Sequence, residues 1–191
     1  MNSSGLPSND FASVPAPTSS GTQMMAGRQA QEVQAAIFLA KSFPRDEEAA
    51  MTRILQACKR KRLAEDAEYE FPRGGNKITG PSIRLAEVIA QNWGNMDYGI
   101  LELDQKAGKS EVMAYAWDLQ TNTRRSMTFT VNHARNAGGS VKMLTDPRDI
   151  YEMVANQGAR RVRACILGVI PGDIVDAAIE ECRKTIRESH K

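Results

Sequence analysis

One long helix with both ends marked is the feature that most constrains the fold of this chain. Helix-compatible residues run without a break from Asp146 to Val169, and Ile170-Pro171-Gly172 ends the run. Thr145 or Asp146 can accept hydrogen bonds from the first free N–H groups, and Pro147 suits the first helical position. The sequence therefore predicts a capped helix of about six turns.

This helix has an apolar side and a cationic side. At 100° per residue, an apolar arc separates from a polar arc. Arg161 breaks the pattern because it projects between the directions of Ile150 and Val154, so its charge points to the buried side or to a partner. The apolar arc comprises Ile150, Val154, Gly158, Val162, Cys165, Ile166 and Val169, and the polar arc comprises Glu152, Asn156, Arg160 and Arg163.

Charge is unevenly distributed along the chain. The formal net charge is only +2, yet eight basic and three acidic residues lie between Gln120 and Cys165. Segregation of this kind indicates a polyanionic partner. With 191 residues, the chain is also large enough to bury a core without disulfides or structural metals.

The rare residue types argue against several functional classes. Cys58, Cys165 and Cys182 lie far apart, on or beside apolar helical positions, which is typical of reduced core thiols. His133 and His190 are the only histidines, so we expect no catalytic residue, cofactor or metal. No segment is apolar enough to act as a leader or to cross a bilayer. We therefore expect a cytoplasmic protein without membrane contact, in the bacterial host if a phage encodes it.

The chain divides into an arm and one domain. Residues 1–22, rich in Ser, Pro, Asn and Gly, predict a disordered arm, and residues 23–191 predict a single α+β domain. The basic quartet Lys59-Arg60-Lys61-Arg62 is either a solvated helix end or a contact for a polyanion. Helices are expected over about 27–42, from Pro44 to Arg62, over 81–92, and over 174–189 with Asp173 as a cap.

Two basic loops are expected as well. Segment 73–82 is glycine-rich and lacks the GxxxxGK[ST] order of a nucleotide-binding loop. It is either a flexible cap or an anion site in which Arg73, Lys77 and the following helix N-terminus meet a phosphate. Segment 133–144, which contains Arg135, predicts a mobile loop with His133 at the surface.

Three strands, expected over 96–104, 111–119 and 124–131, are close enough in sequence for an antiparallel meander. A two-residue turn at Thr121-Asn122 would place Ala114 opposite Phe129 and Ala116 opposite Met127, on a face that packs into the core. The other face suits stacking of nucleic-acid bases, and it equally suits covering a helix or a neighbouring subunit. That face would gather Tyr115, Trp117, Arg124, Ser126, Thr128 and Thr130.

Together these elements predict an α+β fold. N-terminal helices precede a three-stranded antiparallel β-meander, which packs against a long C-terminal helix, and a final short helix follows. This order and the segment from Ile150 to Cys182 resemble the phage single-strand annealing recombinases of the RecT and Redβ type. The resemblance is carried by Asp146-Pro147-Arg148, by Ala159 to Leu167, and by the helix break Ile170-Pro171-Gly172-Asp173-Ile174-Val175.

The resemblance implies an ATP-independent protein that assembles into rings or helical filaments. It implies binding and annealing of single-stranded DNA in a basic groove between the sheet and the long helix. Further implied partners are an exonuclease or a host single-strand binding protein, although the chain ends soon after the core that longer family members extend. Phosphate contacts would fall to Arg160, Arg161, Arg163, Arg124, Arg125, Arg135, Lys77 and Arg73, and base stacking to Tyr115 and Trp117.

Two other classes are compatible with the residues. An oligomeric structural or adaptor protein would use its arginines at subunit interfaces, with Arg161 paired to an acid such as Glu180 of a neighbour. Arg161 therefore contacts either DNA or a neighbouring subunit. A metal-dependent nuclease would need paired acids near a basic groove, and the available carboxylates are those of Asp97, Asp104, Asp118 and Asp149.

Overall fold

The computed structural model describes residues 20–189. The predicted arm, residues 1–22, falls outside this range except for its last three residues, which belong to helix α1, Ser20–Ser42. The chain forms two compact units, Met1–Ala35 and Ala36–Lys191. Helix α1 crosses this boundary, and the second unit holds every other helix and strand of the described chain.

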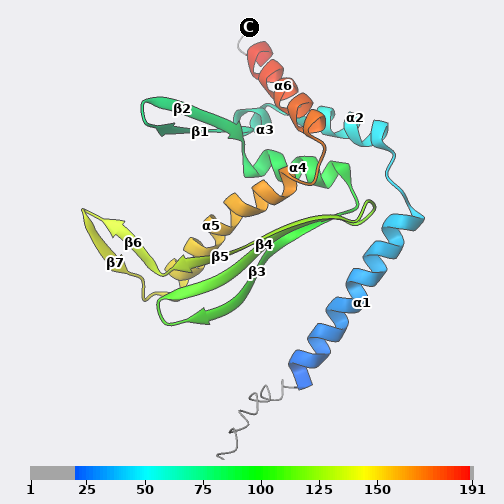
Figure 1. Cartoon of the computed structure of the whole chain (residues 1–191). Helices are drawn as coiled ribbons and strands as arrows, with labels where there is room; N and C mark the ends of the chain where they lie inside the picture. Colours follow the sequence, from blue (N-terminus) through cyan, green and yellow to red (C-terminus); the bar gives the residue numbers. More distant parts are fainter. Residues whose placement is uncertain (1–19, 190–191) are drawn as a thin grey trace, which may run out of the picture. The chain divides into compact units, whose positions relative to one another are not determined.

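The second unit has the predicted α+β fold (Figure 1). A three-stranded antiparallel sheet packs against the long helix α5, and a final helix follows α5. Two hairpins lie outside this sheet. After α1, the elements are α2 (Glu47–Cys58), α3 (Lys61–Glu65), β1 (Glu68–Arg73), β2 (Asn76–Pro81), α4 (Ile83–Trp93), β3 (Met96–Lys106), β4 (Lys109–Asp118), β5 (Thr123–Asn132), β6 (Ala134–Ala137), β7 (Ser140–Met143), α5 (Pro147–Leu167) and α6 (Gly172–Ser189).

The sheet is the predicted meander, with strand order β3-β4-β5. Its two faces follow the predicted alternation. Ala114 and Ala116 are fully buried on the inner face, toward α5. Tyr115 and Trp117 point to the opposite, outer face.

The register between β4 and β5 differs from the prediction by two residues. The turn is longer than expected because the Asp118 side chain organises it: its Oδ1 accepts hydrogen bonds from the N–H groups of Gln120 and Thr121, at 3.0 and 3.1 Å. A shift of two residues keeps every side chain on its predicted face, since sides alternate with a period of two. The observed pairs are Ala114 with Met127 and Ala116 with Arg125.

Helix α5 lies between the sheet and helices α2, α3, α4 and α6 (Figure 1). Val162, Cys165 and Ile166 share one core cluster with Ala114 and Ala116. The small side chains of β4 allow close approach, so the Cys165 Sγ lies 3.7 Å from the Ala114 carbonyl oxygen. On its other side α5 contacts α4, which packs on α2. The predicted apolar arc is therefore the buried side of this helix.

The helix predicted from Pro44 to Arg62 is two helices. Asp46 caps α2 by accepting a hydrogen bond from the Ala49 N–H at 3.0 Å. Because α2 ends at Cys58, the basic quartet falls across the junction, and its last two residues open α3. The three cysteines are buried and free, as predicted.

Both predicted basic loops are β-hairpins, formed by β1 with β2 and by β6 with β7. Each tip is a glycine pair, Gly74-Gly75 and Gly138-Gly139, in which all four residues have positive φ. Tight two-residue turns with positive φ at both positions suit the twist of antiparallel strands. The glycines thus close two hairpins instead of loosening two loops.

His133 is buried, in contrast to its predicted surface position, with 3% of its area exposed. Its Nε2 and the Ser110 Oγ are hydrogen-bonded at 2.8 Å. The His133 N–H donates to the Gly108 carbonyl, and the His133 carbonyl accepts from the Leu144 N–H, both at 2.8 Å. His133 therefore anchors the base of the β6–β7 hairpin to the sheet.

Candidate nucleic-acid interface

The polar arc of α5 faces away from the core, as predicted. Asp146 caps this helix and Pro147 opens it, so its direction is set locally by the residues that the sequence marks. Arg160 is exposed, and Arg163 is half-buried. We call the polar arc the α5 outer stripe; it comprises Glu152, Asn156, Arg160 and Arg163.

Arg163 is held against an aromatic ring from the β1–β2 hairpin. Its guanidinium carbon lies 4.2 Å from the centroid of the Tyr69 ring. The ring fits because its cross-strand partner is Gly80, where a Cβ atom would come within 3.0 Å of Tyr69. A stacked guanidinium keeps its N–H donors at the edge of the plane, so Arg163 is pre-oriented to donate to an anion.

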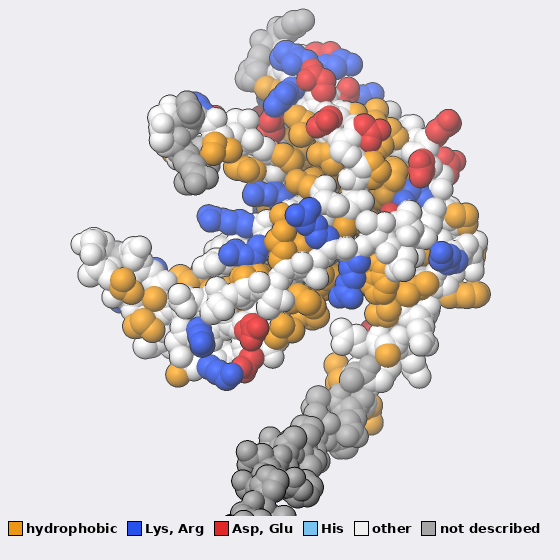
Figure 2. Space-filling model, in the orientation of Figure 1, with side chains coloured by type: hydrophobic (Ala, Val, Ile, Leu, Met, Phe, Trp, Pro, Cys, Tyr) orange, Lys and Arg blue, Asp and Glu red, His pale blue; other side chains and the backbone are white. Residues whose placement is uncertain are grey.

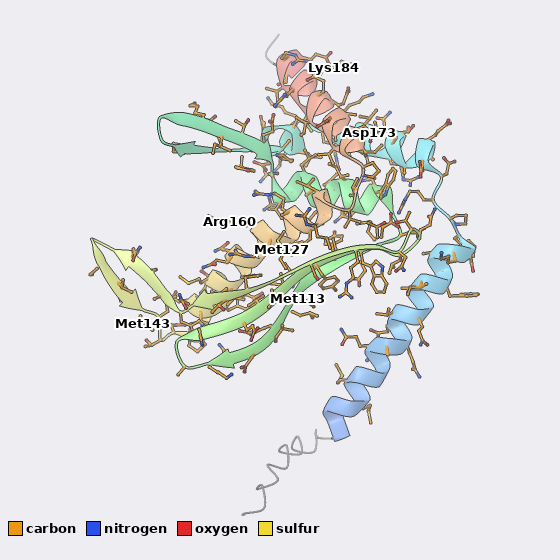
Figure 3. All side chains as sticks on the ribbon, in the orientation of Figure 1. Met113, Met127, Met143, Arg160, Asp173 and Lys184 are labelled. Carbon is orange, nitrogen blue, oxygen red and sulfur yellow. The ribbon has the colours of Figure 1, made fainter. Side chains whose placement is uncertain are left out.

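Arg160 lies in a hollow of the molecular surface. Figure 2 shows Lys and Arg side chains gathered over α5 between the two hairpins, and Figure 3 labels Arg160 there. Among the described residues, no ion pair joins Arg160 to a carboxylate, whereas Arg148 of the same helix pairs with Glu152 at 3.1 Å. A cation without a carboxylate partner in a hollow is available to an external anion.

The β6–β7 hairpin adds two cations in an unfavourable pairing. Arg135 and Lys142 are directly opposite each other across the strands, and both are exposed. Like charges at directly opposed positions destabilise a strand pair. An anion that bridges them would remove this repulsion.

The cations of the β1–β2 hairpin are weaker candidates for binding an anion. Lys77 pairs with Glu70, its near neighbour across the strands, and that hydrogen bond raises the pKa of Lys77. The charge of Lys77 is therefore partly neutralised by Glu70 within the hairpin. Arg73 ends β1, but its side chain lies outside the described part of the structure.

Two of the predicted phosphate ligands lie against other parts of the fold. The Arg161 guanidinium carbon lies 4.0 Å from the centroid of the Phe129 ring, and its Nη1 donates to the Gln157 carbonyl at 2.9 Å. Arg161 thus packs toward the sheet, on the buried side of α5. Arg125 lies against the C-terminal end of α5, where a Cβ added to Gly168 would overlap its side chain.

The outer face of the sheet gathers the predicted aromatic and hydroxyl side chains. Arg124 lies over Trp117 and Tyr115, at 5.3 and 5.9 Å from the ring centroids. The Tyr115 hydroxyl donates to Asp97 at 3.2 Å, and the Trp117 Nε1 donates to Asn122 at 3.0 Å. Burial, and then the charge and hydrogen bond of Asp97, raise the pKa of Tyr115. Together the hydrogen bonds hold both rings in place.

Within the described chain the inner face of the sheet packs directly on α5, so the predicted groove does not pass between these two surfaces. The inner face of the sheet and α5 form one continuous core cluster, so no strand of DNA fits between them. The outer sheet face and the α5 outer stripe lie on opposite sides of this packed pair. Figure 3 labels one residue from each face of the sheet, Met127 toward α5 and Met113 away from it.

Part of the basic quartet lines a cavity of about 460 Å³ beside α4. Arg60, Arg62 and Arg84 border it, together with Asp66 and Glu87. The Arg60 Nε donates to the Ala57 carbonyl at 3.1 Å. Both positive and negative groups line this cavity, so it is less selective for a polyanion than the α5 outer stripe.

Two residues of the candidate interface escaped the sequence patterns as site residues. In the sequence, Tyr69 is one tyrosine in an extended segment. No neighbouring residue indicates that the fold places its ring against Arg163. Lys142 has a detectable signal, because a Gly-Gly turn between Arg135 and Lys142 implies a hairpin that pairs them.

Within residues 20–189, no group of three or more His, Cys, Asp or Glu side chains is placed to hold a metal ion. In the same part of the chain, no helix combines the length and the apolar character that a membrane span needs. In comparisons with known proteins, no family model, no curated protein and no solved structure matches the chain.

Proposed function

We propose that the protein binds single-stranded DNA through phosphates along the α5 outer stripe and anneals complementary strands without ATP. The proposal is carried by Arg160, which lies in a hollow between two hairpins that bear further cations, and by Arg163, which stacks on the Tyr69 ring. Contacts to the backbone alone neutralise charge and leave the bases free to pair, which is what annealing requires.

Assembly of several copies is the second part of this proposal. A ring or filament would align many α5 outer stripes, so that one strand crosses successive subunits. The cytoplasm as location is an expectation drawn from the sequence. A bacterial host, and an exonuclease or host single-strand binding protein as partner, are expectations that rest on the family resemblance alone.

A structural or adaptor protein is the second candidate. The contact of Arg161 with Phe129 and the position of Arg125 beside Gly168 are compatible with it, because neither arginine needs DNA to account for its position. This candidate predicts assembly without affinity for DNA. A magnesium-dependent nuclease predicts strand cleavage instead.

One assay distinguishes these functions. Labelled complementary strands are mixed with the protein, without ATP, while duplex formation and strand length are followed. We expect faster annealing, with single-strand affinity that falls steeply as salt rises. Arg160→Ala should lose most of the acceleration. Arg187→Ala is the matched control, because it removes an exposed arginine that pairs with Glu180 on α6. Absence of single-strand binding by the wild-type protein at low salt would reject the proposal.

A further inference from the structure

We propose that Cys58 and Cys182 form a reversible disulfide bond when the protein meets a peroxide. The inference goes beyond the proposed function, because it requires neither DNA nor assembly. All three cysteines are free in the structure, which is therefore the reduced state of this pair. In the cytoplasm, the location that the sequence predicts, disulfides are usually transient and sense the redox state.

The two cysteines lie on helices that pack together. Cys58 is the last residue of α2 and Cys182 belongs to α6, and Figure 1 shows α6 beside α2 and α3. The Thr185 Oγ1 donates a hydrogen bond to the Cys58 carbonyl at 3.1 Å. Because residues three apart share one side of a helix, Cys182 and Thr185 both face the end of α2. The fold thus brings together two thiols that are far apart in the sequence.

The two thiols differ in acidity because they are in contact. The pKa of Cys58 is lowered, chiefly because the Cys182 thiol hydrogen-bonds to its sulfur and further by the charge of Arg60, against burial and the charge of Glu181. The same hydrogen bond, together with burial, raises the pKa of Cys182. Cys58 is therefore the residue that becomes the thiolate, which is the reactive form of a cysteine.

A cavity gives small molecules access to the pair. Its volume is about 520 Å³, and Cys182 lines it together with Ala64, Ile186 and charged side chains. The cysteines themselves are buried, with 0% of Cys58 and 1% of Cys182 exposed. A peroxide molecule is little larger than water and fits this cavity, whereas a thiol on another protein does not reach buried sulfur atoms. The site therefore favours a disulfide within the chain over one between chains.

The reaction balances with one molecule of peroxide. Cys58 loses its proton, and its thiolate attacks one peroxide oxygen; the O–O bond breaks, and the hydroxide that leaves takes up the proton to become water. This step leaves a sulfenic acid on Cys58. The Cys182 sulfur then attacks the Cys58 sulfur, the S–O bond breaks, and the hydroxyl group leaves as a second water with the proton of Cys182. Two thiols are oxidised to one disulfide, and a small dithiol reverses the reaction by thiol–disulfide exchange.

The bond would stabilise the second unit. The loop that it closes, from Cys58 to Cys182, contains every strand of the described chain. A disulfide that closes a long loop restricts the unfolded chain, provided that the native geometry accommodates the bond. We therefore expect unfolding of the oxidised protein to require more urea than unfolding of the reduced protein.

The test exposes the reduced full-length wild-type protein to hydrogen peroxide in its native state. Free thiols are then alkylated in denaturant, and peptides are identified by mass spectrometry without reduction. We expect a linked pair of peptides that contain Cys58 and Cys182, with Cys165 alkylated. Cys165 is the internal reference, because its Sγ lies 3.7 Å from the Ala114 carbonyl oxygen and burial raises its pKa. Dithiothreitol should restore three alkylatable thiols, and the urea midpoint should be higher before this reduction than after it.

Two substitutions serve as matched controls. Cys182→Ala should give no internal link and no rise of the urea midpoint on oxidation, whereas Cys165→Ala should keep both. The wild-type measurements decide the question even if a variant is too unstable to purify. Three alkylatable thiols after peroxide treatment, a link that involves Cys165 or joins two chains, or a midpoint that does not rise on oxidation would each overturn the inference. These readouts do not depend on whether the protein binds DNA.

Discussion

Arg45 and Asp118 form a buried ion pair: their Nη1 and Oδ2 atoms are 2.9 Å apart, and their side chains are 2% and 4% exposed. The other Arg45 nitrogens donate to the carbonyls of Trp93 and Gly94, at 2.9 and 2.8 Å. The pair thus joins the segment before α2, the end of α4 and the β4–β5 turn.

Removal of Asp118 should therefore destabilise the whole domain. Asp118→Ala leaves the Arg45 charge buried without a counter-ion and removes the acceptor that shapes the turn. We expect the free energy of unfolding to fall by about 3–5 kcal/mol, measured by urea denaturation. Glu152→Ala breaks the exposed pair with Arg148 and should cost less than about 1 kcal/mol. Similar losses in both variants would contradict the central role of the buried pair.

The Arg45–Asp118 pair also shows where prediction from sequence stops. The long helix and the faces of the meander follow from periodicity and caps, because each depends on neighbours in the chain. Arg45 has no local signal, since its partners come from α4 and from the β4–β5 turn. The register error has the same origin, because Asp118 lengthens a turn that otherwise fits two residues.

Arg124 and Arg125 show the same limit of sequence-based prediction for the candidate site. Arg124 and Arg125 are alike in sequence, yet one stacks on outer-face aromatic rings and the other lies at the end of α5. Strand alternation predicts that they separate. The two faces of the sheet do not line one common groove because α5 packs on the inner face, and this packing is seen only in the structure.

Substitutions of Arg160 and Arg161 should have different effects, the first on DNA affinity and the second on stability. Arg160→Ala removes an exposed phosphate ligand, so the slope of log affinity against log salt should become shallower by about 1, with the urea midpoint unchanged. Arg161→Ala removes a contact with the Phe129 ring and should lower the free energy of unfolding by about 1–2 kcal/mol. Its salt slope should stay at the wild-type value. Fluorescence anisotropy at several salt concentrations measures the slopes, and a reversed pattern would exchange the two roles.

The Tyr69 ring should matter for DNA binding through its face and not through its hydroxyl. Tyr69→Phe keeps a surface on which Arg163 stacks, so single-strand affinity should stay close to wild type. Tyr69→Leu removes that surface, and affinity should fall about as far as in Arg163→Ala, roughly 5–30-fold for a loss of about 1–2 kcal/mol. A double variant, Tyr69→Leu with Arg163→Ala, should be no weaker than Arg163→Ala alone. Additive losses would show that the ring contacts DNA directly.

The close approach of α5 to β3 depends on Gly158. A Cβ atom there would lie 2.9 Å from the Ile100 Cγ2 and 3.0 Å from its Cδ1. Gly158→Ala should therefore destabilise the domain by about 1–3 kcal/mol through overpacking, although alanine favours a helix by about 1 kcal/mol. In an Ile100→Ala background the clash is absent, and the same substitution should be neutral or stabilising. Gly172→Ala, where nothing lies within 4 Å, is the control and should change stability by less than about 0.5 kcal/mol. Urea denaturation of the four-member cycle gives the coupling, and a value near zero would mean that α5 shifts freely on the sheet.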